Sequence, residues 1–361
     1  MVPAELYYPI FVVLMCMLTT AISLKIASYS NMHLLKGRNS SSIIRVFCFL
    51  FIIIIGLRPA DALCFGDSES YCDNYLSMQA HSFSIIETGH DVLFYQFMML
   101  CSKYVSVNVF FLLIEIGYVV PLIIASKKMF KNNADLAMMF CLGAFSFFSY
   151  GTNGLRHGLA ASLIILFFSL WNGRLIEKIL GLVIAFIAYN IHGSIILPFV
   201  AFIIAVYYPK TKTYILFWFL SIILSLLFSG FFSSLFSTID FADDRLASYL
   251  GRTDRYRYDF LLYSVVPIAF GYIVIIRKKI KDSVYSNILN TYIICNAFWI
   301  MIINAEFSNR FAYLSWFLYP FLLAYPLLRI SVWKGQARIA SYTYIGQSLF
   351  TLFMMIRDAM R

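Results

Sequence analysis

Charged residues are scarce in this chain of 361 residues: Asp, Glu, Lys and Arg make up only 13% of it, and 61% of it is hydrophobic. A soluble domain has about 25% charged residues. No polar stretch is longer than roughly 30–35 residues, too short to bury a core of its own. The composition therefore excludes a sizeable soluble domain and predicts an integral membrane protein.

The chain also lacks the short motifs of several enzyme classes. It contains no Walker loop, no GxSxG elbow and no HExxH pair. Only one carboxylate, Glu115, falls deep within a predicted span, so there is no series of acids for a proton relay. These absences argue against a nucleotide hydrolase, a serine-triad hydrolase, a zinc protease and an ion-driven transporter.

Cysteine is not abundant either, and five of the seven cysteines fall in or beside apolar segments, where the thiol acts as a small hydrophobic group. Cys64 and Cys72 share one polar loop. An oxidising compartment would permit a disulfide between them, and the sequence leaves its formation open. Their spacing and the lack of a histidine cluster do not suit a metal site, so we expect no metal and no cofactor.

What the chain has in plenty is long apolar runs, and a spanning helix needs about 20 such residues. The predicted spans are 6–27, 41–57, 104–126, 136–151, 155–171, 175–191, 194–209, 213–232, 261–276, 286–304, 311–328 and 339–356. Segment 91–102 is too short to span and is predicted to be interfacial or re-entrant. The sequence thus predicts a single all-α membrane domain over 1–361, with about 11–12 transmembrane helices.

The N-terminal run, Met1–Leu24, has no positive n-region and no small-residue cleavage pattern, so we expect a retained first span rather than a signal peptide.

Basic residues predict the orientation. Loops after the odd-numbered spans hold 18 of the 28 Lys and Arg residues: Lys25, Lys36, Arg38, Arg45, Lys127, Lys128, Lys131, Arg174, Lys178, Lys210, Lys212, Arg277, Lys278, Lys279, Lys281, Arg329, Lys334 and Arg338. This side is predicted to be cytoplasmic. The other side holds most of the acids: Asp61, Asp67, Glu69, Asp73, Glu87, Asp91, Asp240, Asp243, Asp244, Asp254, Asp259 and Glu306.

The outer side carries two long loops, 58–92 and 233–260, which we expect to contain short helices. Its basic residues are arginines except for Lys103. Arginine offers a planar fork that suits phosphate and carboxylate, whereas lysine is a point charge. The alternative is that these arginines reach to the membrane interface or pair with the acidic loops.

Three arginines lie at the outer membrane boundary: Arg58 ends the second span, Arg156 opens the fifth and Arg310 opens the eleventh. Ionisable groups at this depth usually face a bundle interior or an aqueous cavity. Arg156 and Arg310 also sit at helix N-termini, which attract anions. Together the three arginines suit a diphosphate; otherwise each merely caps its helix at the interface.

Other candidates surround these arginines. His192, in a tight outer turn, suits a general base or a phosphate ligand, or is simply a hydrogen-bonded turn residue; His157 points to another face of its helix from Arg156. The first outer loop combines acids with aromatic rings, which suit sugar hydroxyls and sugar faces, and the second mixes arginine with acids and tyrosine. The candidates from these loops are Asp67, Tyr71, Asp73 and Tyr75 in the first and Arg252 and Arg255 in the second.

The pattern resembles the EpsG-like, Wzy-type bacterial polysaccharide polymerases. The resemblance rests on Arg58 followed by Gly66-Asp67, on Gly154-Leu155-Arg156-His157-Gly158-Leu159-Ala160, on Ile191-His192-Gly193-Ser194, and on Asn309-Arg310-Phe311-Ala312-Tyr313. These motifs run over most of the chain in the family's order. The acid that matches the family's is Asp67, with Asp61 and Asp73 as alternatives.

The resemblance implies a GT-C-like membrane glycosyltransferase of the bacterial inner membrane, active at the periplasmic face. Such enzymes join repeat units carried on undecaprenyl diphosphate. Arg58, Arg156, Arg310 and Tyr313 would bind the donor, and His192 or an acid of the first loop would act on the acceptor. A chain-length regulator is a possible partner, and nucleic acid is not. The alternatives are a lipid-linked oligosaccharide flippase, a membrane acyltransferase, or another transferase or ligase for polyprenyl-diphosphate sugars.

Overall fold

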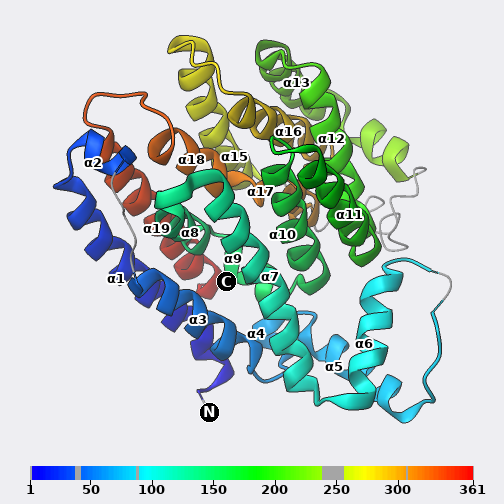
Figure 1. Ribbon diagram of the computed structural model, residues 1–361. Coiled ribbons are helices and arrows are strands. Elements are labelled where there is room, and N and C mark those ends of the chain that lie inside the picture. The colour runs from blue at the N-terminus through cyan, green and yellow to red at the C-terminus, as the bar shows by residue number, and fades with distance from the viewer. Residues whose placement is uncertain (1, 37–41, 87–88, 238–255, 306–307, 361) are drawn as a thin grey trace. The chain divides into compact units, whose positions relative to one another are not determined.

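The computed structural model describes residues 2–36, 42–86, 89–237, 256–305 and 308–360, and no β-strand occurs in these ranges. The chain is an all-α polytopic membrane protein (Figure 1). Six of the described helices are long and apolar enough to cross a membrane: Ala4–Ala27, Val107–Gly143, Thr211–Phe228, Tyr258–Arg277, Asn309–Leu328 and Gln336–Ala359. Shorter apolar helices lie at Ser42–Gly56, Leu155–Leu170 and Gly193–Tyr207.

The helices form two compact units, the first of which is Met1–His192 with Leu327–Arg361. Its α-helices are α1 (Tyr7–Ala27), α2 (Asn31–Lys36), α3 (Ser42–Gly56), α4 (Ala62–Phe65), α5 (Ser68–Ala80), α6 (Val92–Tyr104), α7 (Val107–Phe130), α8 (Ala134–Gly143), α9 (Phe147–Thr152), α10 (Leu155–Leu170), α11 (Leu175–Ile191) and α19 (Gln336–Ala359).

The second unit is Gly193–Pro326. It contains α12 (Ile196–Tyr207), α13 (Thr211–Ser237), α15 (Tyr258–Gly271), α16 (Ser283–Met301), α17 (Asn309–Trp316) and most of α18 (Tyr319–Leu328). A buried polar network holds it together. The side chain of Asn296 on α16 accepts from the Trp218 indole at 2.8 Å and donates to the hydroxyls of Ser264 and Ser315, each at 3.0 Å.

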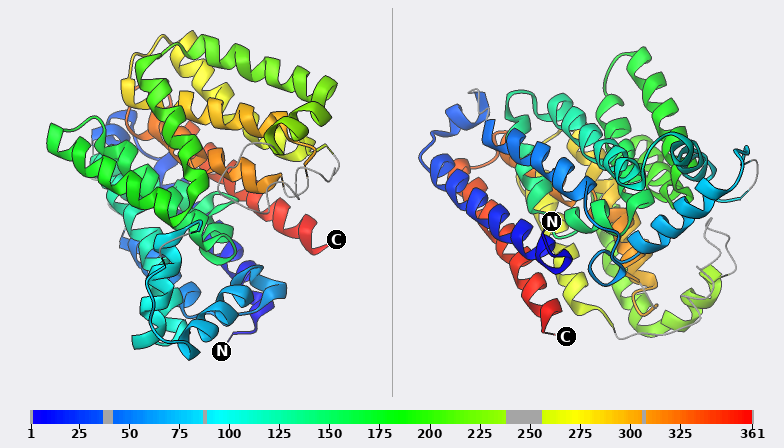
Figure 2. Two further views of the ribbon diagram at one scale, coloured as in Figure 1. Left: turned by 90° about the vertical axis from the view of Figure 1, so that its right-hand side faces the viewer. Right: turned by 90° about the horizontal axis from the view of Figure 1, so that it is seen from below.

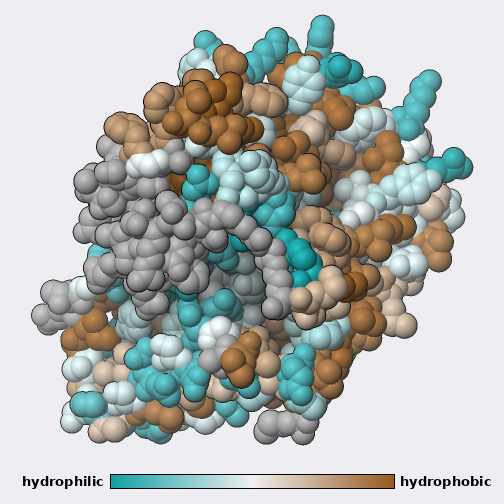
Figure 3. Space-filling view, turned by 180° about the vertical axis from the view of Figure 1, so that it is seen from behind, coloured by the Kyte–Doolittle hydropathy of each residue, from teal (hydrophilic) through white to brown (hydrophobic). Residues whose placement is uncertain are grey.

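Helix α1 shows why these segments are stable in a membrane. One side of it is buried and packs along α19, side by side in Figure 2. The contact includes reciprocal hydrogen bonds between Ser23 and Ser341, in which each hydroxyl donates to the other residue's carbonyl. Such bonds between small polar residues support helix pairs in lipid. Apolar residues such as Leu14, Met17 and Leu24 stay exposed on α1, as expected where lipid covers the surface. Apolar side chains are likewise spread over the face in Figure 3.

Each predicted span corresponds to a helix or to a pair of helices, so the helical assignment is confirmed. One span that was predicted to be continuous is wrong in that respect. Span 136–151 is α8 and α9, separated by extended backbone at Ala144. Span 311–328 lies within the helical segment Asn309–Leu328, in which α17 ends at Trp316 and α18 begins at Tyr319. The loop 58–92, which is predicted to be an outer loop, carries short helices as predicted: α4 and α5.

The segments that were assigned to the basic side meet at one end of the first unit. The Asn133 side-chain amide donates to the carbonyls of Leu34 and Leu328 at 2.9 and 2.8 Å. Lys128, near the end of α7, pairs with Glu177 in the first turn of α11. At the other end lie α4, α5 and α6 (Figure 1). Helix α6 has 13 residues, about 20 Å long, too short to cross a bilayer of about 30 Å.

This arrangement predicts the side of the membrane from which newly introduced cysteines react with a labelling reagent. In a chain with Cys64 and Cys72 changed to Ser, Asn74→Cys on α5 should be labelled by a membrane-impermeant maleimide in intact spheroplasts. Asn132→Cys, in the turn after α7, should be labelled only after permeabilisation. Both positions are exposed, so access to the thiol does not distinguish them. The reverse labelling would overturn the orientation.

Candidate functional site

Helix α10 begins with an arginine in its first turn. The N-cap is Gly154, and Arg156 is the second residue of the helix. The first N–H groups of a helix have no partner within it, and the helix dipole is positive there. Arg156 thus adds a guanidinium to backbone that already favours an anion. Its side chain is 18% exposed, so the charge is neither fully buried nor free in solvent.

Asp91 is the residue that Arg156 contacts most closely, with 2.5 Å between Arg156 Nη1 and Asp91 Oδ2. Asp91 is the N-cap of α6 and has left-handed backbone angles, φ 57° and ψ 35°. An N-cap aspartate ordinarily accepts from its own helix, but this side chain makes no such cap bond. Its carboxylate reaches away from α6 instead, toward α10 and α11, and its side chain is only 2% exposed.

His192 contacts the same carboxylate oxygen. It follows the last residue of α11, and its Nδ1 lies 3.2 Å from Asp91 Oδ2. When Nδ1–H donates to Asp91, the other ring nitrogen, Nε2, is the acceptor of the neutral imidazole. His157, 9% exposed, follows Arg156 on α10, and its ring lies 5.2 Å from the His192 ring. Although His157 adjoins Arg156 in sequence, its ring packs beside His192.

Two tyrosines flank Arg156. Its Nε donates to the Tyr71 hydroxyl at 3.1 Å, and its guanidinium lies 5.9 Å from the Tyr71 ring and 5.6 Å from the Tyr95 ring. Burial raises the pKa of Tyr71 and outweighs the opposing effect of Arg156, so the phenol stays neutral at physiological pH. Helices α5, α6, α10 and α11 thus contribute Tyr71, Asp91, Tyr95, Arg156 and His192 to one cluster, which we call the Asp91 cluster.

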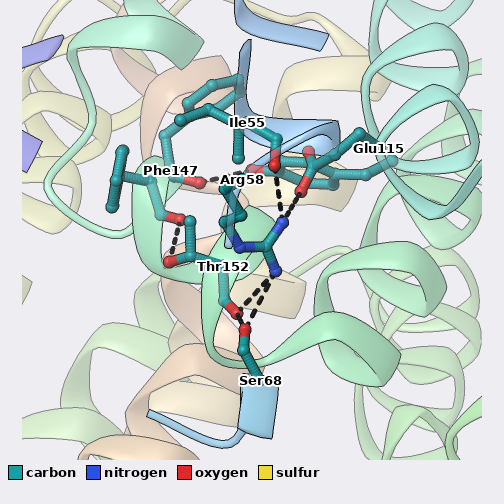
Figure 4. A network of polar contacts seen from close by, with 8 residues as sticks. Ile55, Arg58, Ser68, Glu115, Phe147 and Thr152 are labelled. Atoms are coloured by element: carbon teal, nitrogen blue, oxygen red, sulfur yellow. Dashed lines mark hydrogen bonds and ion pairs between the residues drawn. The ribbon is translucent and has the colours of Figure 1, made fainter. Parts of the chain in front are cut away.

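Arg58 lies in a separate, fully buried network (Figure 4). Its guanidinium donates to the carbonyls of Ile55 and Thr152 at 2.8 and 3.0 Å and to the Ser68 hydroxyl at 3.1 Å. Glu115 on α7 balances its charge, with 3.5 Å between Nη1 and Oε1. The Phe65 and Phe111 rings lie 5.5 and 5.0 Å from the guanidinium carbon. In this position Arg58 binds protein groups, and its predicted role toward substrate stays a prediction.

The Arg58 network is linked to the Asp91 cluster through the chain. Thr152 and Asn153 directly precede the N-cap of α10, and the Asn153 side chain accepts from the backbone N–H of Asp67 at 3.0 Å. Gly66, with φ +57°, permits this approach, because a Cβ there would lie 2.4 Å from the Asn153 oxygen. Asp67 is the N-cap of α5, which carries Tyr71. These contacts therefore fix the start of α5 against the start of α10.

The remaining candidates are spread more widely. Asp67 lies near enough to Tyr71 to raise its pKa slightly. Asp73 is exposed on α5. Tyr75 is fully buried, its hydroxyl donates to the Val105 carbonyl at 2.6 Å, and burial raises its pKa to about 12.

Four candidates lie elsewhere in the chain. Arg310 and Tyr313 belong to α17 of the second unit, where the Tyr313 ring lies 5.6 Å from that of Trp316. Arg252 and Arg255 lie outside the described residues. The two loop cysteines, Cys64 and Cys72, are free in the structure.

Sequence reasoning missed Asp91 and Tyr95 as site residues and did not pair Glu115 with Arg58. For Asp91 one signal was available: it directly precedes an apolar helix on the acidic side, where an N-cap is expected. The left-handed backbone that turns its carboxylate toward Arg156 has no comparable signal in the sequence.

These features define a class: a polytopic membrane protein with an arginine, a histidine and a carboxylate joined at the N-terminus of a helix that opens a predicted span. The chain belongs to the EpsG family, the family of Wzy-type polysaccharide polymerases. The family model matches residues 41–360. Membership indicates a polymerase-type role in polysaccharide synthesis. No curated protein and no solved structure matches the chain significantly.

The buried pair of Arg58 and Glu115 gives a prediction about stability. Glu115→Gln should leave Arg58 buried without a counter-charge and destabilise the protein by about 3–5 kcal/mol. The double variant Arg58→Met/Glu115→Leu should recover much of this loss, because it removes both charges together. Thermal unfolding of purified protein in detergent, followed by tryptophan fluorescence, measures the effect.

The matched control is Glu177→Gln, which breaks the exposed ion pair with Lys128 and should change Tm little. A Glu115→Gln variant as stable as wild type would show that the buried charge is compensated by something other than Glu115.

Proposed function

We propose that this protein joins oligosaccharide repeat units carried on undecaprenyl diphosphate, at the outer face of the bacterial cytoplasmic membrane. The observation that carries the proposal is the Asp91 cluster. It combines an arginine at a helix N-terminus, which suits a diphosphate, with a histidine held by a carboxylate, which suits a hydroxyl. An arginine that binds the leaving diphosphate and a histidine that accepts the hydroxyl proton suit the transfer of a sugar from a diphosphate to an alcohol.

In the proposed reaction, an acceptor hydroxyl of one repeat unit attacks the anomeric carbon of the other. A new glycosidic C–O bond forms and the bond from the anomeric carbon to the diphosphate oxygen breaks. The electron pair of that bond stays on undecaprenyl diphosphate, and the hydroxyl proton passes to Nε2 of His192 and then to water. Arg156 stabilises the charge that develops on the leaving diphosphate, by charge-assisted hydrogen bonds.

Other candidates have supporting parts in this proposal. Arg310 and Tyr313 on α17 are kept as proposed donor-binding residues, and Asp67, Asp73 and Tyr75 belong to the loop that is proposed to bear the acceptor site. Arg252 and Arg255 are proposed to bind the diphosphate of the second lipid-linked repeat unit. Arg58 helps to position the site, because its hydrogen bonds hold the start of α5 against the segment that leads into α10. A chain-length regulator stays a possible partner.

A flippase is the main alternative, and the Arg58–Glu115 pair argues against it. A flippase needs charged groups along a path through the bilayer. Glu115 is the only deep carboxylate that the sequence predicted, and its side chain and that of Arg58 are both 0% exposed. They bind each other and the backbone, so they do not line an aqueous path in this structure.

The role of Arg156 is tested in a deletion strain complemented with variants, by gel banding of surface glycan. Arg156→Ala should reduce polymer at least 100-fold, the scale of losing one charge-stabilising donor. Arg156→Lys should restore only part of it, since lysine keeps the charge but loses the fork. Arg357→Ala, which breaks a surface contact with Asp358, is the matched arginine control and should polymerise normally. Normal ladders from both Arg156→Ala and Arg310→Ala would end the diphosphate proposal.

The role of His192 is tested in the same strain. His192→Ala should slow polymerisation about 10²–10⁴-fold, the usual contribution of a general base, while protein level and membrane insertion stay normal. His33→Ala, an exposed histidine on α2, serves as the control. If deletion of the whole gene leaves the ladder intact, the polymerase proposal fails and the flippase and acyltransferase alternatives gain support.

A further inference from the structure

One carboxylate oxygen in the Asp91 cluster serves two partners. Asp91 Oδ2 lies 2.5 Å from the Arg156 guanidinium and 3.2 Å from His192 Nδ1. The carboxylate is almost fully buried, so water screens these contacts poorly. Arg156 and His192 therefore compete for the same negative charge, and the state of one affects the other.

The direction of this effect follows from the charges. A nearby carboxylate favours the imidazolium form of a histidine, and a nearby guanidinium disfavours it. With Arg156 on Asp91, the positive charge offsets the carboxylate that His192 contacts. A diphosphate bound to Arg156 would neutralise that positive charge or draw it away from Asp91. In either case the imidazolium form of His192 becomes more favourable, so His192 accepts a proton more readily.

The other groups around His192 do not reverse this direction. His157 faces it from α10, with 5.2 Å between the rings. Asp91 faces it from the start of α6, and Arg156 acts on it through Asp91. Tyr71 and Tyr95 flank Arg156, and Tyr71 is held neutral by burial.

We propose that Asp91 is a positioning residue that couples occupancy of the diphosphate site at Arg156 to proton acceptance by His192. The inference rests on the proposed function, because it takes the diphosphate to bind at Arg156. Its consequence is an order of events: the acceptor hydroxyl loses its proton efficiently only once the donor is in place. The geometry that allows this is a carboxylate oxygen that contacts both Arg156 and His192 and makes no cap bond to its own helix.

The test is a titration of the histidines by NMR. The chain has five histidines, so ¹⁵N-histidine labelling of the purified protein in lipid nanodiscs gives few signals, and a His192→Gln variant assigns the one of interest. Inorganic pyrophosphate is the probe, its binding is measured by calorimetry, and sodium chloride matches the ionic strength. In wild type, pyrophosphate should move the titration midpoint of His192 to higher pH by about one unit.

Variants separate Asp91 from a general charge effect. In a folded Asp91→Asn variant, the pyrophosphate-induced shift of the His192 midpoint should be less than half of the shift in wild type. Arg156→Gln should move the midpoint upward without pyrophosphate and remove the response to it. Glu69→Gln, which removes an exposed carboxylate on α5, should behave as wild type. Asp91→Glu keeps the charge and should retain part of the shift, which tests the coupling even where Asp91→Asn fails to fold.

The outcomes distinguish this inference from the proposed function. If pyrophosphate binds and His192 does not respond, or responds fully in Asp91→Asn, the coupling is overturned and the diphosphate site stands. If pyrophosphate does not bind to wild type, or binds equally well to Arg156→Gln, the diphosphate site fails and the coupling fails with it.

Discussion

The Arg58 guanidinium lies where four helices meet, and the end of the first unit that carries α4, α5 and α6 depends on it. It bonds a carbonyl at the end of α3, the first residue of α5, a carboxylate on α7 and the last carbonyl of α9. A buried arginine is costly unless its charge is balanced and its donors are used. Glu115 provides the balance, and the donors on Nη1 and Nη2 find their acceptors only when these four helices are assembled in this way, whereas Nε is buried without a hydrogen-bond partner among the described residues.

The hydrogen bonds around Arg58 also hold the segments that lead to the Asp91 cluster. The segment Thr152–Asn153 receives the bonds from Arg58, Ser68 and Asp67 and then leads directly into α10. Helix α5, held at its start by the same bonds, brings Tyr71 onto Arg156. The fully buried Arg58 thus helps to position the partly exposed Arg156, and the two have different surroundings although both lie at the boundary of predicted spans.

Arg58 and Arg156 differ in what surrounds the guanidinium group. Arg58 has two flanking phenylalanine rings and no exposed surface, whereas Arg156 is partly exposed between two tyrosines whose hydroxyls tolerate water. Arg156 keeps 18% of its side chain exposed, so the proposed diphosphate has access to it. Arg58 would have to leave Glu115 in an apolar interior to bind one.

The sequence by itself determined the class of the protein, the existence of its helices and most of their limits, because apolar length and the bias of basic residues act locally along the chain. It also singled out Arg156, His192 and Tyr71, which the fold gathers into one cluster. Only the tertiary structure decided that Asp91 joins them, that Glu115 neutralises Arg58, and that span 136–151 is broken at Ala144. These depend on a left-handed N-cap and on contacts between residues 57 to 101 positions apart in the chain. No local pattern encodes such contacts, since they form only when several helices pack together.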